Sequence, residues 1–306
     1  MRNLYSRDAG SGETRRGSVA SLSLTVNPMH AKYKGIVSTP GFCKFSAWKR
    51  ETEIPKQSFS SWILGNMGNQ SKNKVWMKDI TTGRSETYAS AKIHVERVVK
   101  GLSKLGVEKG SVVCMWTTNF VEYWICCLAA WELGAAVMPV NCLIHTDKLA
   151  TQLLETAAGY LVCDELNLED ALALKSKVSS IKHIILMDQD ECAEDALCFR
   201  KLMNTEENVR VSLKPVSLEK DPIYLIWTSI KDEPLLVEHT NKSLLSQMFS
   251  PSGTSNHWLD QNQSEVVFGG CWFFHTTGLY SFALSAALGL TLHVLSEYTD
   301  ENTRNG

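Results

Sequence analysis

The feature that most constrains the fold is a regular alternation of helical and strand-like segments that begins at Thr87. One apolar stripe recurs at helical spacing and consists of Ala91, Val95, Val98, Leu102 and Leu105. Thr87 offers an N-cap hydroxyl before this stripe, and Gly106 follows it as a residue that tolerates the left-handed end of a helix. Residues 112–116 are a short apolar run, typical of a buried strand. The sequence therefore predicts a helix that leads directly into a strand.

The same alternation continues as far as Met187. We expect further helices at residues 120–133, 147–157 and 168–178. We expect further strands at residues 136–140, 160–163 and 183–187. Strands that alternate with helices are typical of right-handed crossovers and a parallel sheet. The predicted fold class is therefore α/β, with largely parallel sheets flanked by helices.

The second half of the chain is less regular. Residues 189–219 are polar, and we expect them to form an irregular connection between subdomains. Residues 223–228 are apolar and predict another buried strand, which we place in a second, incomplete layer. Residues 241–248 predict a short helix.

Residues 266–295 contain no Asp, Glu, Lys or Arg. The stretch is long enough to cross a bilayer as a helix, so a membrane anchor is an alternative for it. Gly269, Gly270, Gly278 and Gly289 interrupt the stretch, however, and aromatic residues crowd its middle. We therefore expect a strand, a loop, a buried helix and a strand, and no membrane span.

The amino-acid composition limits which partners the chain is expected to bind and which cellular compartment it is expected to occupy. The chain has 31 Lys and Arg residues against 33 Asp and Glu, so no basic excess favours nucleic acid, and we expect no such partner. The 9 cysteines form no C-x-x-C pair, which favours buried free thiols in a reducing compartment. We expect an intracellular, cytoplasmic protein and leave peroxisomal or mitochondrial association open. Residues 1–39 have no apolar stretch long enough for a signal peptide, and residues 1–58 are expected to be disordered or irregular.

Several passages from a helix into a strand resemble a known family. They read TGRSETY at residues 82–88, GLSKLGVEKGSVV at 101–113, GAAVMPVN at 134–141 and SIKHII at 180–185. Together they resemble the acyl-CoA synthetase, coumarate-CoA ligase and firefly-luciferase group of adenylate-forming enzymes. The resemblance implies part of an AMP-binding (adenylation) domain over residues 59–306, and a C-terminal lid domain that this chain lacks.

The resemblance also places a phosphate-binding loop. In the family this loop is a turn rich in Ser, Thr and Gly that ends in Pro-Lys-Gly, between a strand and a helix that starts Thr-His-x-Asn-Leu. Residues 226–236, IWTSIKDEPLL, occupy this place. The family pattern is kept at Thr228, Ser229, Pro234 and Thr240, and its glycines and lysine are absent.

These changes have a physical cost. A phosphate nest needs converging backbone N–H groups, which glycine permits, and the left-handed region costs a residue such as Ile230 roughly 1–2 kcal/mol. Asp232 and Glu233 would repel a triphosphate by about 1 to 4 kcal/mol per contact. Lys231 could offset part of this, although Leu235 stands where the family keeps its lysine. We therefore expect ATP and Mg not to bind productively; the alternative is an ordinary charged surface turn.

The candidate nucleotide-binding residues are Thr228, Ser229, Lys231 and Thr240.

Residues 273–279, FFHTTGL, resemble the aromatic-His-x-x-Gly-Leu segment that lines the acyl pocket of the family. The resemblance makes Phe274, His275 and Gly278 candidates for binding the carboxylic acid. An imidazole beside aromatic rings could orient a carboxylate. The alternative is a hydrogen-bonded core histidine.

In the family, a carboxylate attacks the α-phosphate of ATP to give an acyl-adenylate, and the thiol of CoA then displaces AMP. The resemblance places the catalytic Lys, the ribose-binding Asp and a Tyr-Gly-x-Thr-Glu segment for adenine and Mg beyond Gly306. We therefore expect a truncated, degenerate and inactive acid:CoA ligase, with no catalytic residue or metal ligand of its own. One alternative is a non-catalytic module that binds a carboxylic acid, CoA or a full-length paralogue. The other is a protein anchored in a membrane by residues 266–295.

Overall fold

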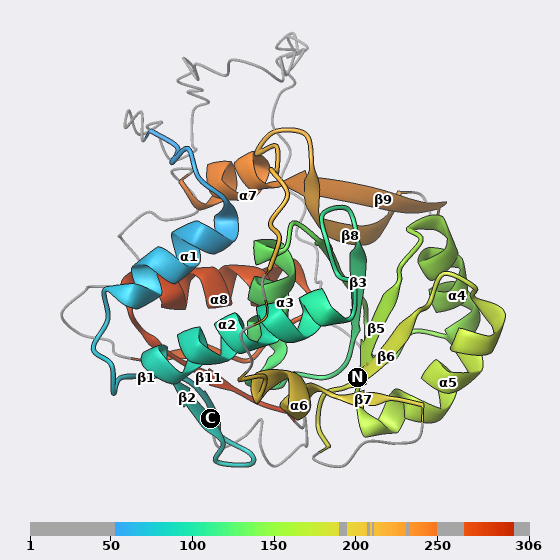
Figure 1. Cartoon of the computed structure of the whole chain (residues 1–306). Coiled ribbons are helices and arrows are strands. Elements are labelled where there is room, and N and C mark those ends of the chain that lie inside the picture. Colours follow the sequence, from blue (N-terminus) through green and yellow to red (C-terminus); the bar gives the residue numbers. More distant parts are fainter. Residues whose placement is uncertain are drawn as a thin grey trace, which may run out of the picture. The chain divides into compact units, whose positions relative to one another are not determined.

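The computed structural model describes residues 53–189, 195–206, 209, 211–230, 233–249 and 266–296, and Ile230 by its backbone alone. Helices and strands alternate along this part of the chain (Figure 1). Its helices are α1 (Phe59–Gly68), α2 (Tyr88–Lys104), α3 (Tyr123–Glu132), α4 (Thr146–Glu155), the 3-10 turn η1 (Glu165–Asn167), α5 (Leu168–Lys177), α6 (Phe199–Met203), α7 (Asn241–Met248) and α8 (Thr276–Leu288). Its strands are β1 (Val75–Asp79), β2 (Ser85–Thr87), β3 (Val112–Trp116), β4 (Ala136–Pro139), β5 (Tyr160–Cys163), β6 (His183–Leu186), β7 (Leu197–Cys198), β8 (Pro222–Ile230), β9 (Glu233–Thr240), β10 (Val266–Gly269) and β11 (Thr291–Val294). The predicted α/β class is confirmed.

The larger sheet has seven strands in the order β7-β6-β5-β3-β4-β8-β9. All its neighbours are parallel except β8 and β9. Val113 of β3 lies opposite Val137 of β4 on one side and opposite Tyr160 of β5 on the other. The central strands are apolar throughout because helices cover both faces of the sheet.

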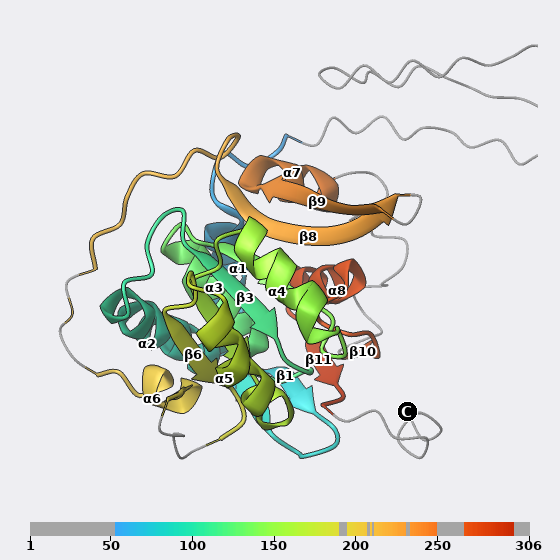
Figure 2. The ribbon, with the colours of Figure 1, turned by 90° about the vertical axis from the view of Figure 1, so that its right-hand side faces the viewer.

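The two faces of this sheet belong to two separate cores. Val113 and Met115 of β3 pack in the core that contains α2 and α3. Cys114 and Trp116 point the other way and pack in the core that contains α4 and α5. Figure 2 shows α4 and α5 on one side of the strands and α2 on the other. This is the period of two expected of a strand that is buried on both faces.

Helix α2 has the ends that its sequence predicts. The hydroxyl of Thr87 accepts a hydrogen bond from the backbone N–H of Ser90 at 3.0 Å, and the Ser90 hydroxyl accepts one from the N–H of Thr87 at 2.9 Å. This reciprocal pair is a capping box. Gly106 takes a φ of 86° just beyond the helix, where a side chain would be strained.

The smaller sheet has four strands in the order β10-β11-β1-β2. Strands β10, β11 and β1 are parallel, and β2 is antiparallel to β1. The predicted place of β8 in a second, incomplete layer is wrong: β8 belongs to the larger sheet, where Tyr224 lies opposite Val137 of β4. The reason is burial: Ile223 and Tyr224 are 1% and 0% exposed and extend the core of the larger sheet.

The expectation of an irregular connection over residues 189–219 is wrong in part. Strand β7 adds to β6 at the edge of the larger sheet, and α6 packs against α2. Phe199 is fully buried, and a Cβ on Gly101 of α2 would lie 2.9 Å from the side chain of Leu202. The absent side chain at Gly101 therefore lets α6 approach α2 closely.

Residues 266–295 form β10, a loop, α8 and β11, which confirms the predicted order of strand, loop, buried helix and strand. Gly289 ends α8 with a φ of 70°. The hydroxyl of Tyr88 donates to the backbone oxygens of Ser285 and Leu290 at 2.9 and 2.8 Å and ties this end to α2. Within the described ranges, no helix is long and apolar enough to cross a membrane.

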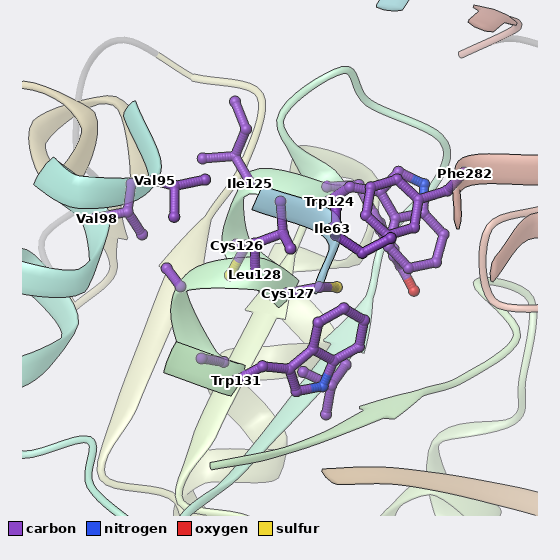
Figure 3. Packing of buried hydrophobic residues seen from close by; sticks show 14 of the residues in the cluster. Ile63, Val95, Val98, Trp124, Ile125, Cys126, Cys127, Leu128, Trp131 and Phe282 are labelled. Atoms are coloured by element: carbon purple, nitrogen blue, oxygen red, sulfur yellow. The ribbon is translucent and has the colours of Figure 1, made fainter. Parts of the chain in front are cut away.

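Aromatic rings fill the core between α3 and α8 (Figure 3). Trp124 stacks on Phe282 with ring centroids 4.3 Å apart and an interplanar angle of 6°. The ring centroid of Phe273 lies 5.3 Å from that of Trp124, with an interplanar angle of 58°. The indole N–H of Trp131 donates to the backbone oxygen of Ile223 at 2.7 Å, which joins α3 to β8. The core thus connects the larger sheet with the elements of the smaller one.

The cysteines of the described residues are free, and all of them except Cys271 are buried. Burial raises the pKa of Cys126 to about 12. Such thiols stay protonated at neutral pH and are poor nucleophiles. Cys43 and Cys192 lie outside the described residues. So do residues 1–52, which make up nearly all of the segment expected to be disordered or irregular.

Candidate functional site

The place of the predicted phosphate loop is occupied by a β-hairpin. Strands β8 and β9 pair from Pro222 opposite Thr240 to Ile230 opposite Glu233, with one shift of register between Pro222 and Tyr224. Thr228 lies opposite Leu235, and Ser229 lies opposite Pro234. The tip residues Lys231 and Asp232 lie outside the described residues.

This backbone geometry differs from that of a phosphate nest. A nest directs successive N–H groups toward one point, whereas successive groups of a strand point to opposite sides. Thr228 and Ser229 are both in the extended strand β8. Their N–H groups therefore cannot converge on one anion in this conformation. Pro234 has no backbone N–H to offer.

The hairpin also lacks positive charge in the part that the structure describes. Residues 222–230 and 233–240 contain Glu233 and Glu238, both exposed, and no Lys or Arg. Leu235 is 42% exposed at the position of the family's lysine. The hairpin therefore presents carboxylates and an aliphatic side chain where a nucleotide would need cations.

Thr240 has a structural role at the start of α7. Its hydroxyl accepts from the N–H of Ser243 at 3.2 Å, and the Ser243 hydroxyl accepts from the N–H of Thr240 at 2.9 Å. This is the same capping box that starts α2. The hydroxyl of Thr240 is thus engaged within the chain.

The segment before α8 has a defined conformation. His275 is exposed and forms the N-cap of α8, where its Nδ1 accepts from the backbone N–H of Thr277 at 3.4 Å. Phe274 is half-buried, and its ring stacks on that of Trp272 at 5.8 Å. The alternative of a core histidine is therefore wrong, because the ring lies at the surface.

Two features fix this segment. Asn119 accepts from the backbone N–H of Phe273 at 2.8 Å and donates to the backbone oxygen of Cys271 at 3.0 Å. At Gly278, a Cβ would lie 2.7 Å from both the Cα of Phe273 and the backbone oxygen of Trp272. The glycine of the motif is therefore required by the close approach of two backbone segments.

The two predicted sets of residues are not joined by any hydrogen bond, ion pair or ring contact in the described part of the chain: the hairpin candidates make none with Phe274, His275 or Gly278. Helices α7 and α8 contribute to the same hydrophobic core, and the hydroxyl of Tyr280 in α8 donates to Gln247 in α7 at 2.7 Å.

In open parallel sheets, ligands bind at the carboxyl ends of neighbouring strands whose following helices lie on opposite faces, and this rule indicates another candidate ligand site. Helix α3 follows β3 on one face, and α5 follows β5 on the other, so a crevice is expected between the carboxyl ends of these strands. Asp164 directly follows β5 and is 1% exposed. Its carboxylate accepts from the Thr117 hydroxyl at 3.3 Å, the Thr118 N–H at 3.0 Å and the Asn167 side chain at 2.9 Å. Asp164 carries no motif of its own, and only this topological rule could have found it.

Two cavities lie elsewhere. One of about 220 Å³ is found at the amino ends of β3, β4 and β8, and one of about 310 Å³ between β2, α2, α3 and α6. Neither is lined by Phe274, His275 or Gly278. No group of three His, Cys, Asp or Glu side chains suited to a metal occurs in the part of the chain that the structure describes.

Comparison with known proteins places the chain in a family. The model of the family described as AMP-binding enzyme matches residues 66–305. 4-Coumarate–CoA ligase 4 of Arabidopsis thaliana is 25% identical over 218 residues, which are 68% of this chain and 37% of that protein. Peroxisomal OPC-8:0-CoA ligase 1 of Arabidopsis thaliana is 23% identical over 272 residues, which are 85% of this chain and 48% of that protein. The chain thus spans less than half the length of these relatives.

Solved structures share the fold. The luciferase-like enzyme of the nonluminescent mealworm Zophobas morio matches with a TM-score of 0.72 and 17% identity, over 84% of this chain and 58% of that one. A long-chain-fatty-acid-CoA ligase of Archaeoglobus fulgidus matches with a TM-score of 0.69 and 17% identity, over 87% of this chain and 51% of that one. The sequence resemblance is thereby confirmed, and the chain belongs to the AMP-binding enzyme family.

Proposed function

We propose that this chain has the fold of an AMP-dependent acid:CoA ligase but does not itself form acyl-adenylates. The observation that carries the proposal is the pairing of β8 with β9 as far as Ile230 opposite Glu233. Activation of a carboxylic acid by ATP requires that the triphosphate be held while the carboxylate attacks the α-phosphate. An extended hairpin supplies no nest for those phosphates.

The residues present do not fit ATP and Mg. Glu233 would stand near the phosphates, and one such like-charge contact costs about 1 kcal/mol in water and about 4 kcal/mol at a dielectric constant near 20. Each 1.4 kcal/mol lowers an affinity about tenfold. We therefore expect ATP binding weaker than that of a functional ligase by orders of magnitude.

Calorimetric titration of the full chain with Mg·ATP should show no saturable binding in the micromolar range. Acid-dependent exchange of diphosphate into ATP should stay at background. Replacing residues 229–236 by a Gly- and Ser-rich loop that ends in Pro-Lys-Gly should raise the ATP affinity. The matched control is Glu233→Lys alone, which changes the charge but keeps the paired strands. Exchange above background in the unmodified chain would refute the proposal.

A second candidate function is binding of a carboxylic acid without activation. It is favoured by the anchoring of residues 271–278 through Asn119 and Gly278, which holds Phe274 and His275 in a fixed arrangement at the surface. An imidazole can donate a hydrogen bond to a carboxylate, and the adjacent rings offer apolar contact. The ligand class would be an aromatic or fatty acid.

Ligand-observed NMR with 4-coumarate and octanoate tests this binding. We expect saturable binding in the unmodified chain and its loss in His275→Asn. Asparagine keeps the ability to cap α8 but removes the imidazole, so the stability of the variant should stay close to that of the parent. Equal binding by both proteins, or by neither, would rule out a role for His275.

A further inference from the structure

Strand β9 forms one edge of the larger sheet (Figure 1). It pairs with β8 on one side, and no strand of the described residues pairs with it on the other. Such an edge presents backbone N–H and C=O groups with which an extended segment of another chain can pair. Pro234 has no backbone N–H, so residues 235–240 are the part of the edge available for such pairing.

The two faces of β9 differ in chemistry. Leu236 packs against the core that contains α4. Val237 lies opposite Ile226, which packs against the core that contains α3. Because the side chains of a strand alternate between its faces, Glu238 shares the face of Leu236, and Leu235 shares the face of Val237. An added strand would therefore meet a carboxylate on one face and aliphatic side chains on the other.

A cavity lies beside β9 on the α4 side. Its volume is about 220 Å³, and it is lined by Leu236 and Glu238 of β9 and by Glu155 at the end of α4. Its one cationic lining residue is Lys109, whose Nζ lies 2.7 Å from a carboxylate oxygen of Asp221. Glu155 and Glu238 are exposed and form no hydrogen bond or ion pair within the described residues. Because Lys109 and Asp221 balance each other, the cavity keeps the negative charge of the other two carboxylates.

The cavity also has an apolar wall, which is made by Val112, Ala136, Leu225 and Leu236. The aliphatic stem of a lysine or arginine side chain packs on such a wall while its charged end stays near water and carboxylates. The volume is that of about seven waters in the liquid, which is enough for one such side chain. Shape and charge therefore both suit a basic side chain.

We propose that the outer edge of β9 is a docking site for an extended, basic segment of a partner protein, which adds a strand to the larger sheet. Lysine or arginine side chains at every second position of this segment face Glu238 and enter the cavity toward Glu155. Apolar side chains at the positions between them cover Val237 and Leu235, of which Leu235 is 42% exposed. A second copy of this chain fits less well, because pairing of two β9 strands would bring their carboxylates together. The docking needs neither ATP nor a carboxylic acid, so it is independent of the proposed function.

Fluorescence anisotropy of a labelled peptide tests the docking. The probe is a peptide of alternating Lys and Val residues, to which the full chain is added. We expect saturable binding that weakens as salt is raised, because the carboxylates are exposed and therefore screened. A peptide of the same composition, with its Lys residues in one block and its Val residues in another, should bind more weakly, because only alternation puts all the charges on one face. Equal binding of the two peptides, or no saturable binding of the alternating peptide, would overturn the proposal.

Substitutions in the full chain locate the docking site. Glu238→Gln and Glu155→Gln should each weaken binding of the alternating peptide about fivefold, the factor that corresponds to about 1 kcal/mol for one charge contact in water. Glu155 belongs to α4 and not to the edge strand, so its effect reports a side chain inside the cavity. The matched control is Glu96→Gln, which removes the same charge from an exposed position of α2 and should leave binding unchanged. Peptide binding unchanged in Glu238→Gln would contradict the assignment.

A backbone-methylated peptide tests the strand pairing itself. Successive N–H groups of a strand point to opposite sides, so methylation of one Lys and the neighbouring Val backbone nitrogen blocks both edges of the peptide. We expect this peptide to lose binding. The control peptide carries a methyl group on the side-chain nitrogen of one Lys, which keeps the charge, and it should bind as the parent does. Undiminished binding of the backbone-methylated peptide would show that charge alone holds it, and strand addition would be ruled out.

Sedimentation velocity distinguishes the partner segment from a second copy of the chain. The repulsion between the carboxylates of two β9 strands predicts that the full chain does not form a dimer through this edge. A dimer that the alternating peptide dissociates would identify a second copy as the occupant, against the proposal.

Discussion

Replacing Trp124 by Ala is expected to lower the free energy of unfolding by about 3–5 kcal/mol. Trp124 is 0% exposed and stacks on Phe282 (Figure 3), with ring centroids 4.3 Å apart. The ring centroid of Phe273 is 5.3 Å away. Truncation removes these ring contacts and leaves a cavity between α3 and α8, which a rigid core fills only in part. Unfolding in guanidinium chloride, followed by circular dichroism, measures the loss.

Trp124→Phe is the matched control for this prediction. The phenyl ring keeps most of the stack on Phe282. It also removes the indole N–H, which is buried without a hydrogen-bond partner in the described part of the chain. We expect a cost below about 1.5 kcal/mol. Equal costs for Ala and Phe would mean that the ring stack contributes little to stability.

The elements with strong local signals could be predicted from the sequence. The strands Val112–Trp116 and Tyr160–Cys163 and the helix Asn241–Met248 have the predicted bounds. Each is delimited by local chemistry: a capping threonine at Thr240 starts the helix, and an apolar run without interruption makes the strand. Local signals of this kind do not depend on the rest of the fold.

The placement of β8 depends on contacts far apart in the sequence, and its prediction was wrong. Nothing in residues 222–230 says whether the strand pairs with β4 or starts another sheet. The choice follows from the burial of Tyr224 against α3, which only the assembled core reveals. Helix α6 was missed for a similar reason. It is only five residues long, and its place depends on the space that Gly101 leaves on α2.

The candidate site likewise has one feature that the sequence predicts and one that it does not. The loss of glycines and of the lysine is visible in residues 229–236, and from it the sequence predicts a degenerate nucleotide site. The cross-strand pairing of Ser229 with Pro234 could not be predicted, because the register of a hairpin is set by its turn and by the sheet it joins. The ligand roles of Thr228, Ser229, Lys231 and Thr240 stay predictions. For Thr240 the structure adds a capping role that would persist without any ligand.

The hairpin also explains how the chain tolerates a long edge strand in place of a loop. A free edge invites pairing with other chains, and natural edges are protected by charges and proline. Strand β9 carries Glu233, Pro234 and Glu238, all exposed. The same carboxylates that disfavour a triphosphate thus protect the edge from aggregation. A loop designed to recover ATP binding would remove part of this protection.

Replacing Gly278 by Ala is expected to destabilise the protein, although alanine favours a helix over glycine by about 1 kcal/mol. The new Cβ would lie 2.7 Å from the Cα of Phe273 and from the backbone oxygen of Trp272, and backbone atoms cannot rotate away as a side chain does. Overpacking of this kind costs about 1–3 kcal/mol. The start of α8 should move away from the preceding turn, and with it the arrangement of Phe274 and His275.

Gly65→Ala is the control, because it makes the same substitution in the exposed helix position of α1, where a Cβ would meet no atom within 4 Å. It should raise the free energy of unfolding by about 0.5–1 kcal/mol through helix propensity alone. Thermal and guanidinium unfolding of the two variants should therefore shift in opposite directions. Because both sites are helical, the difference between them isolates the cost of the close backbone approach at Gly278. Stabilisation by both substitutions would show that the segment before α8 yields easily and does not hold Phe274 and His275 in place.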